Sequence, residues 1–215
     1  TGGWVDRRNL CYNDVKSLIR LAKGDGYIIE NVGFRDIARV VGADLGCVGG
    51  RMINLTDRRC GKNDGPFPVY VVQWFGTAGA SPSANYAPTE DFLADGIYSY
   101  DAERSTFRFN PTKGGHLRNI FSYRAGESAI LLSENLNYDG GYSTISNFVI
   151  DSPILTDIAG NCFEIRGKNL TIRDGVVIGG AEKAMGMESA VNITIDNVEF
   201  RDNCDGATAA GDFRY

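Results

Sequence analysis

The sequence lacks the features that mark several common functional classes. None of its apolar stretches approaches the roughly 20 residues that a membrane-spanning helix requires. Its five cysteines form no Cys-x-x-Cys pair, which argues against zinc-ribbon and thioredoxin-like folds. The formal net charge is −5, whereas a nucleic-acid-binding protein needs a basic face. With no cofactor motif and no metal-ligand set either, the sequence predicts no nucleic acid, membrane insertion, cofactor or metal.

Proline is also scarce, with 6 residues, whereas glycine is abundant, with 27. This balance favours many tight turns between short strands over long helices. At 215 residues, with 43% hydrophobic and 23% charged residues, the chain is long and apolar enough for one folded domain. The N-terminus has no initiator Met and no signal peptide, so we expect a processed chain or a piece of a longer protein.

A short template recurs along the chain. Its copies begin at Ile29, Ile145, Ile172 and Ile195, and each continues as polar, Asn or Asp, small or apolar, variable, apolar. Side chains alternate along a strand, so Ile195 and Phe200 cannot face the same side of one continuous strand. A left-handed Asn or Asp between them restores the phase. Each copy is therefore predicted to be two short strands joined by a corner.

The spacing of these copies predicts a solenoid. The last three begin 27 and 23 residues apart, which is about one turn of a coil that packs on its neighbours. Between them, Phe163 and Ile165, and then Met185 and Met187, alternate with polar or small residues. The prediction is an all-β fold, a right-handed parallel β-helix.

In this coil pattern, over residues 15–60 and 117–205, the sequence resembles the pectate-lyase-like superfamily of right-handed parallel β-helices. That superfamily includes phage tailspikes and many polysaccharide lyases and hydrolases. The resemblance implies a polysaccharide or oligosaccharide ligand, a homotrimer, and an extracellular or virion-surface location. We expect one β-helix domain over 1–215, with early coils at 15–60, an irregular, loop-rich region at 61–116 and regular coils at 117–205.

Some segments outside the template also carry a prediction. Residues 13–23 suit either a short helix or a strand, and the strand over 17–22 is favoured. In the irregular region, 69–75 is predicted to be a buried strand, and the strands 97–100 and 106–109 flank a predicted hairpin turn. Ordered loops of such length are usually functional.

Two carboxylates on neighbouring coils are candidates for polysaccharide hydrolysis, which needs an acid and a second carboxyl group about 5–9.5 Å away. If Ile165 aligns with Met187, Arg166 stacks beside Glu188, and Glu164 lies beside Gly186. Glu164 and Glu188 would then lie diagonally, with Arg166 as a substrate-binding residue. Glu134 and Asp139, one coil earlier, would extend this acidic strip. Solvent-facing charges that only confer solubility are the simpler explanation.

The only histidine, His116, is the candidate base for a polysaccharide lyase. Arg118 lies close by in the sequence and would bind the substrate carboxylate. A surface histidine without a chemical role is the simpler alternative. A serine triad would also have to use His116, but no Gly-x-Ser-x-Gly motif accompanies it.

Aromatic residues of the irregular region are candidates for stacking on sugar rings. They are Trp74, Tyr86, Tyr98 and Tyr100. Trp74 also fits a buried position. Of the three Asn-x-Thr sequons, those at Asn169 and Asn192 are expected at one corner of successive coils, so glycosylation need not be invoked.

Three functions remain open from the sequence. The leading one is a polysaccharide-binding and polysaccharide-degrading protein that resembles a phage tailspike glycosidase acting on cell-surface glycan. The second is a non-catalytic β-helix that binds a receptor or forms part of a virion or adhesin. The third is a lyase for uronate polysaccharides, centred on His116.

Overall fold

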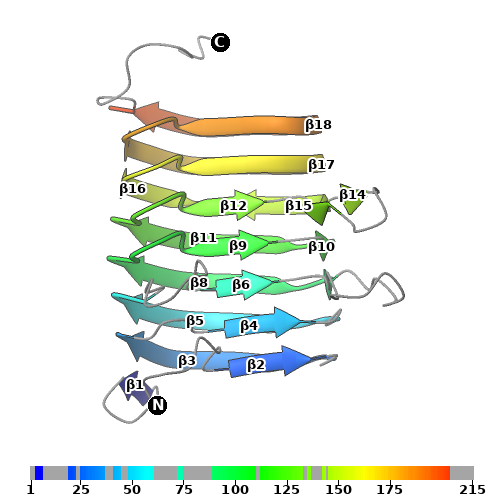
Figure 1. Ribbon diagram of the computed structural model, residues 1–215, viewed down its shortest axis with the longest axis vertical. Coiled ribbons are helices and arrows are strands. Elements are labelled where there is room, and N and C mark those ends of the chain that lie inside the picture. The colour runs from blue at the N-terminus through cyan, green and yellow to red at the C-terminus, as the bar shows by residue number, and fades with distance from the viewer. Residues whose placement is uncertain are drawn as a thin grey trace.

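The structure is a computed structural model in which parallel strands stack along one axis (Figure 1). It describes residues 3–6, 19–22, 25–36, 41–44, 48–60, 72–74, 89–109, 112–132, 135–136, 142–143 and 145–203. Regular secondary structure in these ranges consists of strands alone. The strands are β1 (Gly3–Asp6), β2 (Ile19–Ala22), β3 (Ile28–Arg35), β4 (Val41–Asp44), β5 (Arg51–Arg58), β6 (Val72–Trp74), β7 (Thr89–Glu90), β8 (Leu93–Tyr100), β9 (Phe107–Phe109), β10 (Thr112–Lys113), β11 (His116–Tyr123), β12 (Ile130–Leu132), β13 (Asn135–Leu136), β14 (Tyr142–Ser143), β15 (Ser146–Asp151), β16 (Ile154–Ile158), β17 (Phe163–Gly180) and β18 (Met185–Arg201).

The strands form two parallel series. One runs β1, β3, β5, β8, β11, then β15 with β16, and then the later parts of β17 and β18. The other runs β2, β4, β6, β9, β12, and then the first residues of β17 and β18. The short strands β7 and β10 pair with each other, while β13 and β14 form a separate antiparallel pair. Alternation between the series along the chain is compatible with the predicted parallel β-helix.

The register between neighbouring strands tests the predicted repeat. Ile172 pairs with Ile195, so the predicted offset of 23 residues is confirmed. On its other side, however, Ile172 pairs with Ile150 and not with Ile145. The predicted spacing of 27 residues is therefore wrong, because the copy beginning at Ile145 was aligned on a different corner of the chain.

Three columns of left-handed residues run up the stack. Corner 1 contains Gly26, Gly49, Asp91, Gly114, Asn147, Asn169 and Asn192; corner 2 contains Asn31, Asn54, Gly96, Asn119, Ser152, Asp174 and Asn197; corner 3 contains Asp36, Arg59, Asp101, Arg124, Asp157, Gly179 and Asp202. Every one has a positive φ, and successive corners follow each other every five residues along the chain. The predicted left-handed break is confirmed, and it occurs at all three corners of these layers.

The corners are stabilised by side-chain ladders between layers. The Asn192 amide donates to Asn169 over 3.1 Å, and Asn169 donates to Asn147 over the same distance. At corner 2 the Asn54 amide donates to Asn31 over 2.7 Å. Such hydrogen bonds offset the strain of a left-handed residue that carries a Cβ. The two sequons at Asn169 and Asn192 lie at one corner of successive layers, as predicted.

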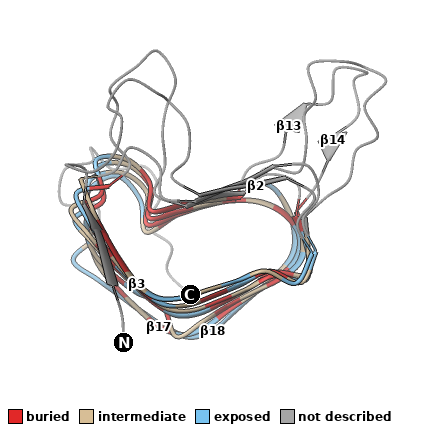
Figure 2. Ribbon diagram, turned by 90° about the horizontal axis from the view of Figure 1, so that it is seen from below, coloured by how far each residue is buried: buried red, intermediate tan, exposed pale blue. Residues whose placement is uncertain are grey.

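The corners divide the outer surface into three faces. The first face lies between corners 1 and 2, the second face lies between corners 2 and 3, and the third face is formed by the series that contains β2. Viewed along the stack, the layers superimpose and bend at the same places (Figure 2). Because side chains alternate on each segment, every second residue points into the core and the others point to solvent.

Aromatic and aliphatic side chains fill the interior. Phe92 stacks on Phe109 with ring centroids 4.9 Å apart, and Phe148 lies 5.1 Å from Phe109. Gly115 makes room for this cluster, since a Cβ there would lie 2.4 Å from the Phe92 ring and 2.5 Å from the Phe148 ring. Each layer thus buries its apolar side against its neighbours.

The stack continues into the region predicted to be irregular. Strand β8 pairs with β5 and β11, and β9 pairs with β6 and β12. The predicted hairpin over 97–109 is therefore wrong, because β8 and β9 belong to different series and Asp101 is a corner rather than a hairpin turn. Residues 19–22 form β2, in agreement with the favoured strand, and 72–74 form β6 inside the predicted strand over 69–75.

Candidate functional site

The carboxylates predicted as a catalytic pair meet at one arginine on the third face. Ile165 pairs with Met187 and Glu164 lies beside Gly186, so the predicted register is confirmed. Arg166 Nη2 lies 2.5 Å from Glu188 Oε2 and 3.8 Å from Glu164 Oε1.

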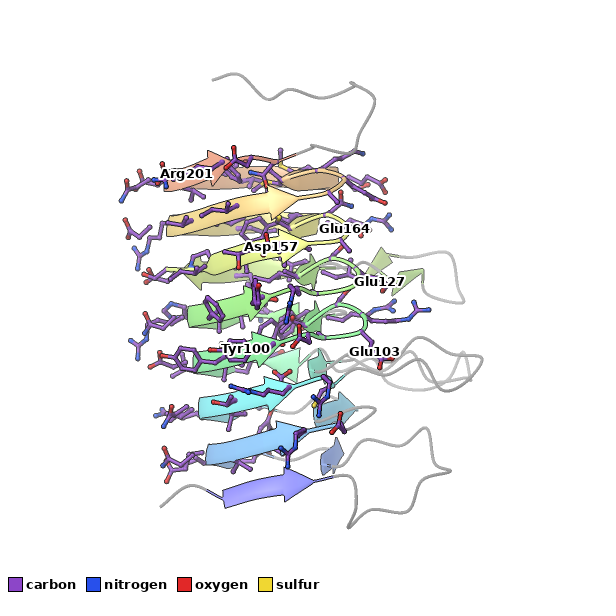
Figure 3. The ribbon with its side chains drawn as sticks, turned by 90° about the vertical axis from the view of Figure 1, so that its left-hand side faces the viewer. Tyr100, Glu103, Glu127, Asp157, Glu164 and Arg201 are labelled. Carbon is purple, nitrogen blue, oxygen red and sulfur yellow. The ribbon has the colours of Figure 1, made fainter. Side chains whose placement is uncertain are left out.

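Other polar side chains near this cluster are paired as well. The Ser128 hydroxyl donates to Glu164 over 3.4 Å, and Arg104 pairs with Glu127 at 2.5 Å. Figure 3 shows Glu103, Glu127 and Glu164 following one another along one edge of the stack. Because Arg166 already occupies an oxygen of Glu188, that carboxylate must leave the guanidinium before it can act on a sugar.

His116 and Arg118 lie elsewhere, on the first face in β11. The His116 Nε2 atom lies 3.8 Å from Asp151 Oδ2 and has no hydrogen-bond partner among the described residues. Arg118 pairs with Asp95 at 2.5 Å, and its hydrogen bond holds the pKa of Asp95 below the ordinary value. Arg118 is therefore engaged by a carboxylate of the protein itself. The structure places His116 and the pair Glu164 and Glu188 on different faces, so they do not form one site.

The remaining predicted residues are only partly described. Trp74 ends β6, where its backbone pairs with Ala43 and Phe109. Tyr86, Glu134 and Asp139 lie outside the described residues.

Tyr98 and Tyr100 belong to a cluster of outward aromatic side chains on the second face. Tyr98 pairs in register with Phe121, and Tyr100 pairs with Tyr123. The Phe121 ring lies 6.5 Å from the Tyr98 ring and 5.3 Å from the Tyr100 ring. We call these four residues the aromatic strip. The two tyrosines of β8 were among the residues predicted to stack on sugars, whereas Phe121 and Tyr123 of β11 were not.

The aromatic strip is accessible because of strand alternation. Ile97 and Ser99 point inward in β8, as Ile120 and Ser122 do in β11, and all four are buried. The intervening rings therefore point to solvent, and Tyr98 is 41% exposed. Ile154, at the next position in register beyond Phe121, is 44% exposed and extends the apolar surface. Rings held on paired strands form a rigid apolar platform.

A buried polar network lies directly behind the aromatic strip. The Ser99 hydroxyl donates to Asp57 Oδ1 over 2.9 Å. Thr106 Oγ1 lies 2.8 Å from Ser122 Oγ and 3.3 Å from Ser99 Oγ. Burial raises the pKa of Asp57 to about 8, with the Ser99 hydrogen bond acting in the opposite direction. At neutral pH this carboxyl group is therefore mostly protonated, which lets it stay in the core.

Arginines lie over two rings of the aromatic strip. The Arg58 guanidinium carbon lies 5.2 Å from the Tyr100 ring centroid, and that of Arg124 lies 4.5 Å from the Tyr123 centroid. Arg124 also pairs with Asp101 at 2.6 Å, so its charge is compensated.

A repeat in the sequence could have predicted the two residues of the aromatic strip that come from β11. The stretches 97–100 and 120–123 read IYSY and IFSY and are 23 residues apart, the same offset as between Ile172 and Ile195. No such repeat predicts the contact between Asp57 and Ser99, because the two residues are 42 positions apart in the sequence.

Two features are absent from the described residues. These ranges contain no helix with the length and apolar character needed to cross a bilayer. They also contain no group of three or more His, Cys, Asp or Glu side chains placed to hold a metal ion.

Comparison with known protein families, with curated proteins and with solved structures finds no match for this chain.

Proposed function

We propose that the chain is a right-handed parallel β-helix, resembling the pectate-lyase-like superfamily, which binds a polysaccharide on its second face. The aromatic strip is the observation that carries this proposal. A sugar ring presents an apolar face beside its hydroxyl groups, and an exposed aromatic ring offers a matching flat surface. The outward rings lie on two neighbouring layers, β8 and β11, and Ile154 adds an apolar side chain in the next layer.

The proposal also accounts for why such side chains are exposed. Scattered apolar residues on a surface are ordinary, but contiguous exposed patches mark interaction sites. Tyr98 and Ile154 are both well exposed, and Phe121 pairs in register with both of them. Tyrosine contributes a large contact area together with a hydroxyl group for hydrogen bonding.

Glycan binding by wild-type protein and by Tyr98→Ala and Phe121→Ala variants tests this function. Removing one ring that buries about 50 Å² of apolar surface forfeits about 1.3 kcal/mol, so we expect about tenfold weaker binding. Ile28→Ala is the matched control, because it removes an exposed apolar side chain from the first face. The measurement is titration calorimetry against a panel of bacterial cell-surface polysaccharides.

Equal loss in the control variant, or unchanged binding in both ring variants, would contradict the proposal. Thermal unfolding of each variant checks that the fold is retained.

Degradation of the bound polysaccharide is a second proposal, favoured by the meeting of Glu164 and Glu188 at Arg166. Glu164→Gln and Glu188→Gln should abolish release of reducing ends if these carboxylates are the acid and its partner. Unchanged release in both variants would remove the pair. Lyase action at His116 would instead give unsaturated products that absorb in the ultraviolet and disappear in His116→Ala.

A non-catalytic β-helix that binds a receptor is the alternative if no bond is cleaved. The homotrimer and the extracellular or virion-surface location are proposals that rest on the resemblance. Light scattering during size-exclusion chromatography measures the oligomeric state directly, and a monomer would contradict the trimer.

A further inference from the structure

The second face carries an unusual charge distribution for an acidic protein. From β3 to β17 its outward positions hold the cationic side chains Arg35 and Arg58 and no acidic one. Beyond these strands, Asp6 of β1 pairs in register with Arg35, and Glu199 of β18 pairs with Arg201. The whole chain, by contrast, has a formal net charge of −5.

Arg58 also differs from several other outward arginines of the stack. Each of several such arginines contacts a carboxylate of the protein: Arg59, Arg118, Arg124, Arg173 and Arg201. Arg58 is exposed and lies over the Tyr100 ring instead, and within the described residues no carboxylate pairs with it. Its positive charge is thus left uncompensated beside the aromatic strip.

The contact with the Tyr100 ring places the charge of Arg58 beside the aromatic strip. A guanidinium stacked on a ring keeps its in-plane N–H donors available, and these match the two oxygens of a carboxylate, sulfate or phosphate. Arg58 lies diagonal to Tyr98, since Thr56 pairs with Tyr98 and Arg58 pairs with Tyr100 in register. A sugar on the rings of β8 would therefore have an arginine at its edge.

We infer that Arg58 is a specificity residue, which binds an anionic substituent of a sugar stacked on the aromatic strip. This inference rests on the proposed function, because it requires a glycan on the second face. It adds that the glycan is acidic and that the preference for acid comes from one side chain.

The test uses oligomers of alginate, a uronate polymer, and the same oligomers after reduction of their carboxyl groups. Wild-type protein should bind the acidic form about tenfold more tightly, as expected for a charge-assisted pair. In Arg58→Gln the two forms should bind with nearly equal affinity. Arg51→Gln is the matched control, because Arg51 is an exposed arginine of the same strand on the first face, and it should keep the preference.

The possible results distinguish a failure of this inference from a failure of the proposed function. If wild-type protein binds both forms equally, or Arg58→Gln keeps the preference, the role of Arg58 is wrong and glycan binding stands. If neither Tyr98→Ala nor Phe121→Ala weakens binding, both the role of Arg58 and the proposed function are wrong. Both are also wrong if wild-type protein binds neither form of the oligomer. This holds above all if Tyr98→Ala changes the mass in solution and so shows that the second face is an interface between copies of the chain.

Discussion

The first and second faces share one backbone but differ in what they present to solvent. On the first face, the positions before corner 2 carry Asp95, Arg118, Asp151 and Arg173 in successive layers, and each acid contacts an arginine. On the second face, the first two of these layers carry the aromatic strip, and the third carries Ile154 and Thr156. Inward residues and left-handed corners maintain the stack on both faces. The outward residues are therefore free to differ, and the face that carries the aromatic strip is the better candidate for binding.

The two faces also differ in their response to pH, and this gives the largest expected effect. Burial raises the pKa of Asp57 from 3.8 to about 8, so the folded state retains a proton that the unfolded chain releases. The stability that this proton contributes is fully present below pH 3.8, falls as pH rises, and is lost above pH 8. The limiting slope is about 1.4 kcal/mol per pH unit.

In Asp57→Asn this decline in stability should largely disappear. Denaturant unfolding at several pH values between 5 and 9 measures it. The same slope in wild type and variant would show that Asp57 ionises freely in the folded state.

Asp151 on the first face should behave in the opposite sense. The Arg173 hydrogen bond lowers the pKa of Asp151, so its contribution is present above the unfolded value and is lost as the pH falls. In Asp151→Asn the loss of stability in acid should be shallower than in wild type. If Asp151→Asn and wild-type protein lose the same stability at low pH, this ion pair is not the cause of that loss.

The corners are common to both faces, and their substitution should affect the whole stack. Asn54 has a φ of 54° and donates to Asn31. Asn54→Ala loses that hydrogen bond and leaves a Cβ in a left-handed residue, so we expect about 1–2 kcal/mol of destabilisation. Asn54→Gly loses the same bond without the strain and should be destabilised less. If both variants unfold alike, backbone strain at the corner is not the cause.

The smallest effect is expected from the exposed charge ladder of the first face. Arg118→Gln should shift the unfolding midpoint slightly at low salt and hardly at all at high salt, because ions screen exposed pairs. Glycan affinity should stay at its wild-type value. A large loss of binding in Arg118→Gln would move the binding site to the first face and revive the proposed role of Arg118.

The sequence predicted the corners of this structure better than it predicted how the copies of the template align. Asn31 and Asn197 predicted the left-handed break, because few other residues adopt it at low energetic cost. The copy at Ile145 was misplaced since Asn147 occupies corner 1 while Ser152, a residue outside the template, occupies corner 2. Asp101 was taken for a hairpin turn because turns and corners favour the same residues.

The site was predicted only in part for a similar reason. Arg166 and Glu188 are close to each other because the local alternation of Ile165 and Met187 set their register, and that signal is visible in the sequence. The contact between Ser99 and Asp57 depends on a layer-to-layer register over 42 residues, which includes a long insertion without the template. Local patterns therefore predicted which residues point outward better than which of them meet.

Nuclear magnetic resonance of the aromatic side chains, with and without the tightest-binding oligosaccharide, tests the central claim most directly. If the second face binds glycan, the ring signals of Tyr98, Tyr100 and Phe121 should shift on titration, as should backbone amides near corner 3 in the same layers. Shifts confined to the amides around Glu164 and Glu188, with those rings unmoved, would place the glycan on the third face and contradict the account.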